Sequence, residues 1–139
     1  MGKAFRNGIE QGSSLIVNLA EVKLKFISTR THGALDFAVP VALMLAPKLF
    51  GFEDNKKAAA VPRMMAATHV AYSLFTDYET GLVRKLPMKG HLALDAGSAL
   101  LLAASPWLLG FAGAVSTPHV AAGLMELGIA ATTETKPKK

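Results

Sequence analysis

The chain has 139 residues, which fits a single domain, and it contains no cysteine. The lack of cysteine excludes a disulfide framework, a thiolate metal site, a cysteine nucleophile and a cysteine-ligated iron–sulfur cluster. Hydrophobic residues make up 51% of the sequence and charged residues only 18%, which excludes an intrinsically disordered chain. The net charge of +5 indicates contact with nucleic acid or with a membrane surface, and the placement of the charges distinguishes the two.

The basic residues lie at the borders of long apolar stretches. They cluster near the N-terminus, between residues 84 and 89, and at the C-terminus, whereas residues 90–133 contain only two charged residues, Asp95 and Glu126. A nucleic-acid-binding domain gathers its basic residues on one face, with aromatic residues among them. The sequence therefore predicts no binding of nucleic acid and favours contact with a membrane.

The first predicted element is a basic N-terminal segment, residues 1–30. Within it, residues 13–27 place Leu15, Leu19 and Phe26 on one face of an amphipathic helix. Four apolar helices follow at about residues 31–47, 62–79, 87–106 and 117–133, where apolar residues that favour helix over strand predominate.

Proline and glycine indicate the helix ends. The missing N–H of proline is not needed in a first helical turn, and glycine readily adopts the left-handed conformation that follows a helix. The prolines expected in first turns are Pro62, Pro87 and Pro118, and the glycines expected after helix ends are Gly51, Gly81 and Gly110.

An internal repeat relates the two halves of the chain. Residues 31–36, Thr-His-Gly-Ala-Leu-Asp, match residues 90–95, Gly-His-Leu-Ala-Leu-Asp. Residues 46–52 match residues 105–111 at the same offset of 59 positions. Each copy is expected to form one helix hairpin.

This repeat predicts the domain organisation after the N-terminal segment. Residues 31–80 form the first repeat, residues 81–90 a basic loop, residues 91–133 the second repeat and residues 134–139 a basic tail. The predicted fold is all-α, a membrane four-helix bundle of two tandem helix-hairpin repeats preceded by the amphipathic helix.

The length and the apolar character of the four helices favour a membrane location. A spanning helix needs about 20 apolar residues, whereas each helix of a soluble bundle needs a polar outer face. If all four helices span, both termini and the loop 81–90 share one side, which carries 11 basic residues against 4 on the other. The positive-inside rule then predicts a multi-pass protein with both termini in the cytoplasm. A soluble four-helix bundle is the alternative.

The expected partner is the lipid bilayer. The basic N-terminal helix would contact anionic lipids at the cytoplasmic face. Aromatic residues are expected at the two membrane interfaces, and the small volume enclosed by four thin helices is compatible with a homo-oligomer. The far interface would contain Phe50, Phe52, Trp107 and Phe111, and the near interface Tyr78.

The segment Ser105-Pro106-Trp107 and the doubled pattern around it resemble the SPW-repeat family of small bacterial and archaeal membrane proteins. The two His-x-x-x-Asp segments and residues 72–79 are also similar to members of that family. The resemblance covers about residues 28–134, and the first copy departs from it by having Lys48 where the tryptophan stands. It implies a protein of the prokaryotic inner membrane built from two tandem repeats, and it implies no settled activity.

Ionisable residues inside apolar helices are candidate functional residues. His32 and Asp36 are four residues apart and share a helix face, and His91 and Asp95 repeat that spacing. Two further carboxylates lie near the ends of the second and fourth helices, where a weaker match at an offset of 50 positions makes them nearly equivalent. In an up-down-up-down bundle all six groups would share one layer near the cytoplasmic side. This candidate set is His32, Asp36, Asp77, His91, Asp95 and Glu126.

Three interpretations of this set remain open. Imidazole and carboxylate ligands suit a divalent ion such as iron, manganese or zinc, and chains of such groups also carry protons. The third is a structural clamp of hydrogen bonds between the helices. His69 and His119 are expected to bond to the backbone or to lipid headgroups. The chain contains no phosphate-binding loop, nucleophile elbow or zinc-protease helix motif, so the sequence favours a structural or accessory membrane protein over an enzyme.

Overall fold

The computed structural model describes residues 11, 13 and 24–137. Most of the amphipathic helix expected at residues 13–27 lies outside the described residues. The described part contains four long α-helices and no strand beyond two isolated bridges, which confirms the all-α class. The helices are α2 (Thr29–Leu49), α3 (Lys56–Phe75), α4 (Met88–Leu108) and α5 (Thr117–Thr132).

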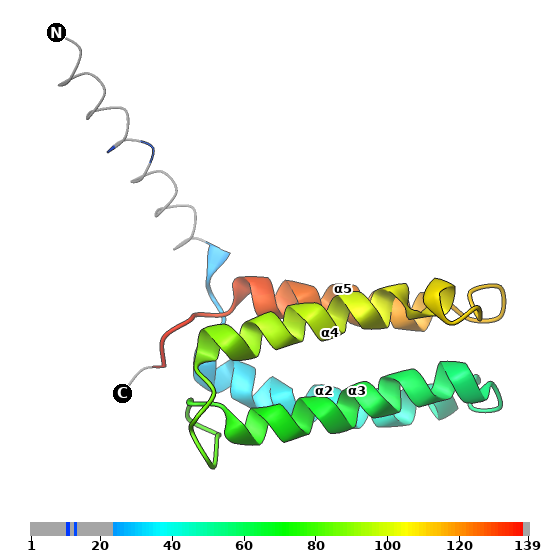
Figure 1. Ribbon diagram of the computed structural model, residues 1–139, viewed down its shortest axis with the longest axis horizontal. Coiled ribbons are helices and arrows are strands. Elements are labelled where there is room, and N and C mark those ends of the chain that lie inside the picture. Colours follow the sequence, from blue (N-terminus) through cyan, green and yellow to red (C-terminus); the bar gives the residue numbers. More distant parts are fainter. Residues whose placement is uncertain (1–10, 12, 14–23, 138–139) are drawn as a thin grey trace, which may run out of the picture.

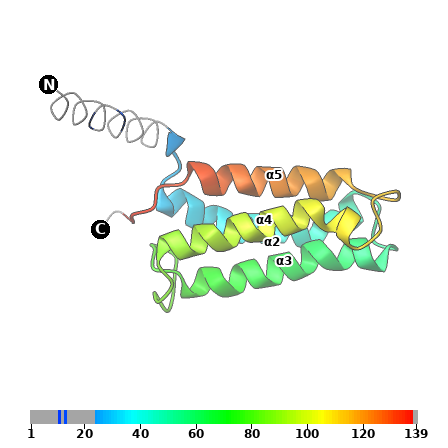
Figure 2. The same cartoon turned by 45° about the horizontal axis from the view of Figure 1, so that its top comes forward.

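The four helices form two antiparallel hairpins that lie side by side (Figure 1). Helix α2 packs on α3, α4 packs on α5, and α3 also contacts α4. The start of α2, the α3–α4 connection and the end of α5 lie at one end of the bundle, and the two hairpin connections lie at the other (Figure 2). This is the up-down-up-down arrangement that the sequence predicts.

The same turn ends α2 and α4. Gly51 has a φ of 67° and Gly110 a φ of 74°, in the left-handed region that glycine adopts without strain. In both turns the following phenylalanine donates its N–H to the carbonyl oxygen of a proline five residues earlier, which is the Schellman motif. These bonds join Phe52 to Pro47 and Phe111 to Pro106, each at 2.8 Å.

Helix α3 begins earlier than predicted. The Asn55 side chain accepts a hydrogen bond from the Ala58 N–H at 3.1 Å and caps the helix, so Pro62 lies inside α3 rather than in its first turn. A proline inside a helix leaves the carbonyl oxygen four residues earlier without its usual N–H donor. Here the Nε2–H of His119, on α5, donates to that oxygen of Ala58 at 2.9 Å. The expected bond of His119 to the backbone is thereby confirmed.

The two hairpins are tied together at their open ends. Helix α3 ends at Phe75, about one turn earlier than predicted, and Thr76 is its C-cap. Thr76 forms a parallel bridge with Leu86, just before α4. Thr133, the C-cap of α5, forms the same bridge with Ile27, just before α2. Each bridge therefore holds the start of one helix beside the end of another.

Large apolar side chains cover much of the outside of the bundle. Val41 on α2, Leu100 on α4 and Leu124 on α5 are each 58–60% exposed. Among the described helices, none is both long enough and apolar enough to meet the usual requirement for crossing a membrane.

The expected interfacial belt of aromatic residues is only partly on the surface. Phe50 and Trp107 are exposed, whereas Phe52 and Phe111 are buried. Phe52 and Phe111 turn inward because they follow the Schellman glycines, where the chain folds back over the end of the bundle. The expectation for these two residues was therefore wrong.

A candidate metal centre between the two repeats

The candidate histidines and aspartates lie on the buried stripe of their helices, near its start. On α2, His32 and Asp36 are followed on the same face by the buried residues Val39 and Leu43. On α4, His91 and Asp95 likewise lie on the buried stripe, which continues to Ala99 and Leu102. Each of the four candidate residues is at most 2% exposed. The helical spacing that the sequence shows is thus the reason why both pairs face the interior.

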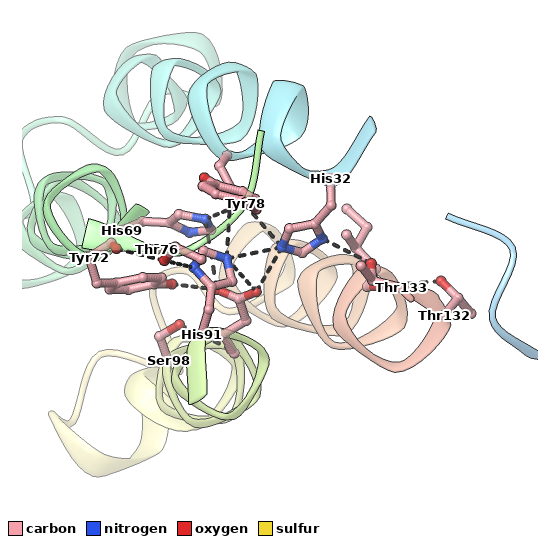
Figure 3. Close-up of polar contacts among 12 residues, drawn as sticks. His32, His69, Tyr72, Thr76, Tyr78, His91, Ser98, Thr132 and Thr133 are labelled. Carbon is pink, nitrogen blue, oxygen red and sulfur yellow. Dashed lines mark hydrogen bonds and ion pairs between the residues drawn. The ribbon is translucent and has the colours of Figure 1, made fainter. Parts of the chain in front are cut away.

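The two pairs meet across the boundary between the repeats (Figure 3). His32 Nε2 lies 3.1 Å from His91 Nε2 and 3.1 Å from Asp95 Oδ2. His91 Nε2 lies 3.2 Å from Asp36 Oδ2. Each Nε2 is also 3.2 Å from the aspartate on its own helix. One possible ligand atom from each of the four residues therefore lies within 4.8 Å of the other three.

The helix caps orient the two imidazoles. His32 Nδ1 lies 2.9 Å from Thr133 Oγ1, and His91 Nδ1 lies 2.8 Å from Thr76 Oγ1. Each threonine hydroxyl also donates to the carbonyl oxygen four residues earlier, at 2.6 Å for Thr133 and 2.8 Å for Thr76. Because a carbonyl oxygen only accepts, each hydroxyl must accept from its histidine, so both Nδ1 atoms carry the proton. The network thereby assigns the lone pair of each neutral imidazole to Nε2.

Tyrosine hydroxyls hold the two carboxylates. Tyr78 donates to Asp36 Oδ2 at 2.5 Å, and Tyr72 donates to Asp95 Oδ1 at 2.6 Å. Burial and the hydrogen bond to the Asp36 carboxylate raise the pKa of Tyr78 above its ordinary value, so it remains a donor. Tyr78 was expected at a membrane interface, but it is buried, because the α3–α4 connection folds back against α2.

The close approach of that connection depends on a glycine. Gly33 lies beneath Tyr78 and Thr80, and a Cβ atom at Gly33 would overlap the Thr80 hydroxyl. The absence of a side chain at this position of α2 therefore lets the loop place Tyr78 over Asp36.

His69 belongs to the cluster, contrary to the expectation that it would bond to the backbone or to lipid. Its Nε2 lies 3.0 Å from Asp36 Oδ1 and 3.8 Å from Asp95 Oδ1. Its ring stacks on Tyr72, with centroids 5.0 Å apart. His69 and Tyr72 are one turn apart on α3, so the same face of this helix contacts both aspartates.

Glu126 on α5 lies next to the cluster. It is buried, and its Oε1 atom has no hydrogen-bond partner among the described residues. Together with His32, Asp36 and Asp95 it lines a cavity of about 10 Å³, which is enough for one water molecule or one ion. Glu126, with its unpaired buried carboxylate oxygen, thus lines the same small space as three of the four convergent residues.

The helix caps correct the predicted equivalence between the second and fourth helices. His69 and Glu126 each lie seven residues before their caps, Thr76 and Thr133. The structural offset is therefore 57 positions, not 50, which is the separation of the two caps. Glu126 corresponds to His69, not to Thr76.

Asp77 is not brought to the cluster. It directly follows the C-cap of α3, where the chain leaves the helix, and its side chain is exposed. Its N–H donates to the Leu86 carbonyl oxygen at 2.7 Å. Of the six residues proposed from the sequence, the structure gathers His32, Asp36, His91, Asp95 and Glu126.

Sequence reasoning missed the groups that position the cluster. These are His69, Tyr72, Thr76, Tyr78 and Thr133. A threonine near the end of a predicted helix is the one sequence signal that points to Thr76 and Thr133. The contact of Tyr78 with Asp36 spans 42 residues of sequence, and no local pattern indicates it.

The fold and the cluster define the class of protein: a small all-α bundle of two hairpins with a buried histidine and aspartate centre between them. The family model of the SPW repeat domain matches residues 30–133. The chain belongs to the SPW repeat domain family. No curated protein and no solved structure matches the chain.

Proposed function

We propose that this protein binds one divalent transition-metal ion between its two repeats, with His32, Asp36, His91 and Asp95 as ligands. The observation that carries the proposal is the convergence of two Nε2 lone pairs on two carboxylates in a buried site. Metal-binding histidines commonly donate their other ring N–H to a fixed acceptor, and the threonine caps provide that acceptor here.

The distances between the ligand atoms suit a metal ion. With metal–ligand bonds of about 2.0–2.1 Å, neighbouring ligands around a tetrahedral ion lie about 3.3 Å apart. Five contacts among His32, His91 and the two aspartates measure 3.1–3.2 Å, with Asp36 using a different oxygen for each histidine, and a set of one ligand atom per residue lies within 4.8 Å. An ion would therefore need the cluster to adjust so that one oxygen of each aspartate serves as its ligand.

The charges of the cluster also favour a cation. Two nearly inaccessible carboxylates are costly to bury without positive charge beside them. A divalent ion would supply it, and it would remove the repulsion between the facing lone pairs. The alternative source of positive charge is protons shared between the histidines and the aspartates. Shared protons are what the proton-pathway and structural-clamp interpretations assume.

The ligand types restrict the choice of metal. Imidazole and carboxylate together suit zinc, iron and manganese, whereas the chain offers no thiolate for soft ions. Glu126 supplies a further oxygen in the adjoining cavity and would extend the coordination beyond four. Asp77 is outside this proposed ligand set.

We further propose that the bundle lies in a prokaryotic inner membrane, with both termini cytoplasmic and the basic end on anionic lipid. The exposed apolar side chains of α2, α4 and α5 support this location. The histidines and aspartates that lower the hydropathy of α2 and α4 face the interior rather than the outside. A homo-oligomer would cover part of the same apolar surface. The described basic residues at the end with the termini are Lys25, Arg30, Arg84, Lys85, Lys89 and Lys136.

Elemental analysis of the full chain purified in detergent tests the metal. We expect about one zinc, iron or manganese ion per chain, lost in the His32→Ala/His91→Ala double variant. Asp36→Asn should lower the occupancy, and the matched control Asp77→Asn, at an exposed position, should keep it. If the wild-type chain held no metal after incubation with each ion, the metal proposal would be contradicted and the shared-proton interpretation would replace it.

Membrane fractionation tests the location separately. The full chain should sediment with membranes and require detergent for extraction. A chain that stays in solution without detergent would contradict the membrane proposal and leave the metal proposal standing.

A further inference from the structure

A second cavity lies toward the opposite end of the bundle from the metal cluster. It is formed between α2 and α5, and residues 112–116 of the α4–α5 connection line it as well. Its volume of about 810 Å³ falls within the usual range for small-molecule sites. The walls are mainly apolar, and they include Val39, Leu43, Phe52 and Leu102.

One buried polar side chain lines this cavity. His119 is 2% exposed, and its Nε2–H donates to the carbonyl oxygen of Ala58 at 2.9 Å. Because that oxygen only accepts, the neutral imidazole has its lone pair on Nδ1. The Nδ1 atom has no hydrogen-bond partner among the described residues. His119 lines the cavity, and its unsatisfied Nδ1 acceptor is covered from solvent in this structure, so a ligand must displace neighbouring side chains to reach it.

The position of the His119 ring is fixed. Its centroid lies 5.2 Å from that of Phe52 and 5.0 Å from that of Phe111. The hydrogen bond to the Ala58 carbonyl oxygen replaces the one that Pro62 cannot donate. Together with the two phenylalanine rings it fixes the orientation of the imidazole. A fixed acceptor in an apolar site favours a ligand whose donor reaches one defined point.

We propose that this cavity binds a lipid-soluble alcohol or phenol, whose hydroxyl group donates its hydrogen bond to Nδ1 of His119. An unsatisfied buried acceptor is costly, and a hydroxyl satisfies it without bringing a net charge into the cavity. A carboxylate ligand is disfavoured because its oxygens would face a lone pair. Phe50 and Met125 line the cavity and are 65% and 50% exposed, so the apolar body of the ligand enters from the outer surface.

No described hydrogen bond or ion pair joins this site to the metal centre, although Val39 lines both cavities. His119 and the residues that hold it contact none of the four proposed metal ligands in any described hydrogen bond or ion pair. Binding at either site can consequently be measured in variants of the other.

Two matched probes test the hydroxyl group: 4-nonylphenol and its methyl ether, which share the same apolar body. Titrated into the full chain in detergent, the phenol should bind about 3- to 10-fold more tightly, the usual net effect of one hydrogen bond. In the same samples the ¹⁵N resonance of His119 Nδ1 should move with the phenol and stay in place with the ether.

Three variants locate the binding. Gly113→Leu adds a side chain at a residue that lines the cavity and where a Cβ meets nothing within 4 Å, so it should occupy part of the cavity without a clash and weaken binding of both probes. Gly97→Leu is the matched control, since it also meets open space but lies on α4 outside the cavity. His119→Phe should bind both probes with equal affinity.

Two results would overturn the proposal. Equal affinities of the wild-type chain for phenol and ether would show that the cavity takes hydrocarbon without regard to the hydroxyl. Unchanged binding in Gly113→Leu would place the ligand elsewhere. Should His119→Phe fail to fold, the nitrogen resonance of the wild-type chain decides the matter alone.

Discussion

The Nε2 atoms of His32 and His91 lie 3.1 Å apart, although the two histidines belong to different repeats. Neither atom carries a proton in the neutral ring, because both Nδ1–H groups donate to threonine caps. With both rings neutral, two facing lone pairs beside two carboxylates form an electron-rich site, which a shared proton or a metal ion would neutralise. This contact makes the boundary between the repeats the chemical centre of the molecule.

The threonine caps should control metal affinity without being ligands. Replacing Thr133 by valine keeps the shape and removes the acceptor for His32 Nδ1, and Thr76→Val does the same for His91. Loss of such an outer contact typically lowers metal affinity about 10- to 100-fold. Competition with a chelator, followed by elemental analysis, measures the change.

Thr68→Val is the matched control for the cap variants. Thr68 also donates to the carbonyl oxygen four residues earlier, but its hydroxyl is exposed and meets no histidine. Metal affinity should remain at the wild-type level in this variant. Equal losses in Thr68→Val and Thr133→Val would mean that the effect comes from the helix and not from the imidazole.

Tyr78→Phe should destabilise the fold. The hydroxyl is the only part removed, and it donates to a buried carboxylate at 2.5 Å. Hydrogen bonds to charged groups contribute about 1.5–3 kcal/mol, and the free energy of unfolding should fall by about that amount. Denaturant unfolding in detergent measures it. A stability within experimental error of the wild type would show that water replaces the hydroxyl and that the tyrosine does not hold Asp36.

Gly33→Ala and Gly97→Ala should have opposite effects. At Gly33 the added Cβ overlaps Thr80 and touches Tyr78, so the loop must move away from Asp36, at a typical cost of about 1–3 kcal/mol. At Gly97 the Cβ meets open space, and the change should stabilise the helix by about 0.4–1 kcal/mol. Thermal unfolding of the two variants checks both signs, and a stabilised Gly33→Ala chain would contradict the close packing of the loop.

The parts of the site that sequence could predict are those fixed by helical spacing. His32 and Asp36 share a face because they are four residues apart, and the repeat extends this to His91 and Asp95. Their meeting follows from antiparallel packing of two similar hairpins. The all-α class and the turns at Gly51 and Gly110 could also be predicted, because they too depend on local sequence.

The remaining parts depend on where helices end. Asp77 was placed in the cluster because the second helix was expected to continue beyond it, whereas α3 ends at Phe75 and the chain turns outward. Glu126 was aligned with Thr76 by a short sequence match, although the caps align it with His69. These endings are decided by the bridges to Ile27 and Leu86, which are tertiary contacts without a local signature.

Pro62 and His119 should be energetically coupled. In the wild-type chain, His119 is the donor to the Ala58 carbonyl oxygen that Pro62 leaves without a helical partner. His119→Phe therefore removes the hydrogen bond of a buried carbonyl group, at a cost of about 1–3 kcal/mol. In a Pro62→Ala background the alanine N–H can serve this oxygen, so the same substitution should cost less.

A double-mutant cycle on unfolding free energies measures this coupling. We expect His119→Phe to be less damaging by about 0.5–1.5 kcal/mol when residue 62 is alanine, the usual net value of one hydrogen bond. Pro62→Ala alone should stabilise α3, because alanine restores a helical donor and relieves the clash of the proline ring. Strictly additive effects would show that His119 contributes only through its packing between Phe52 and Phe111.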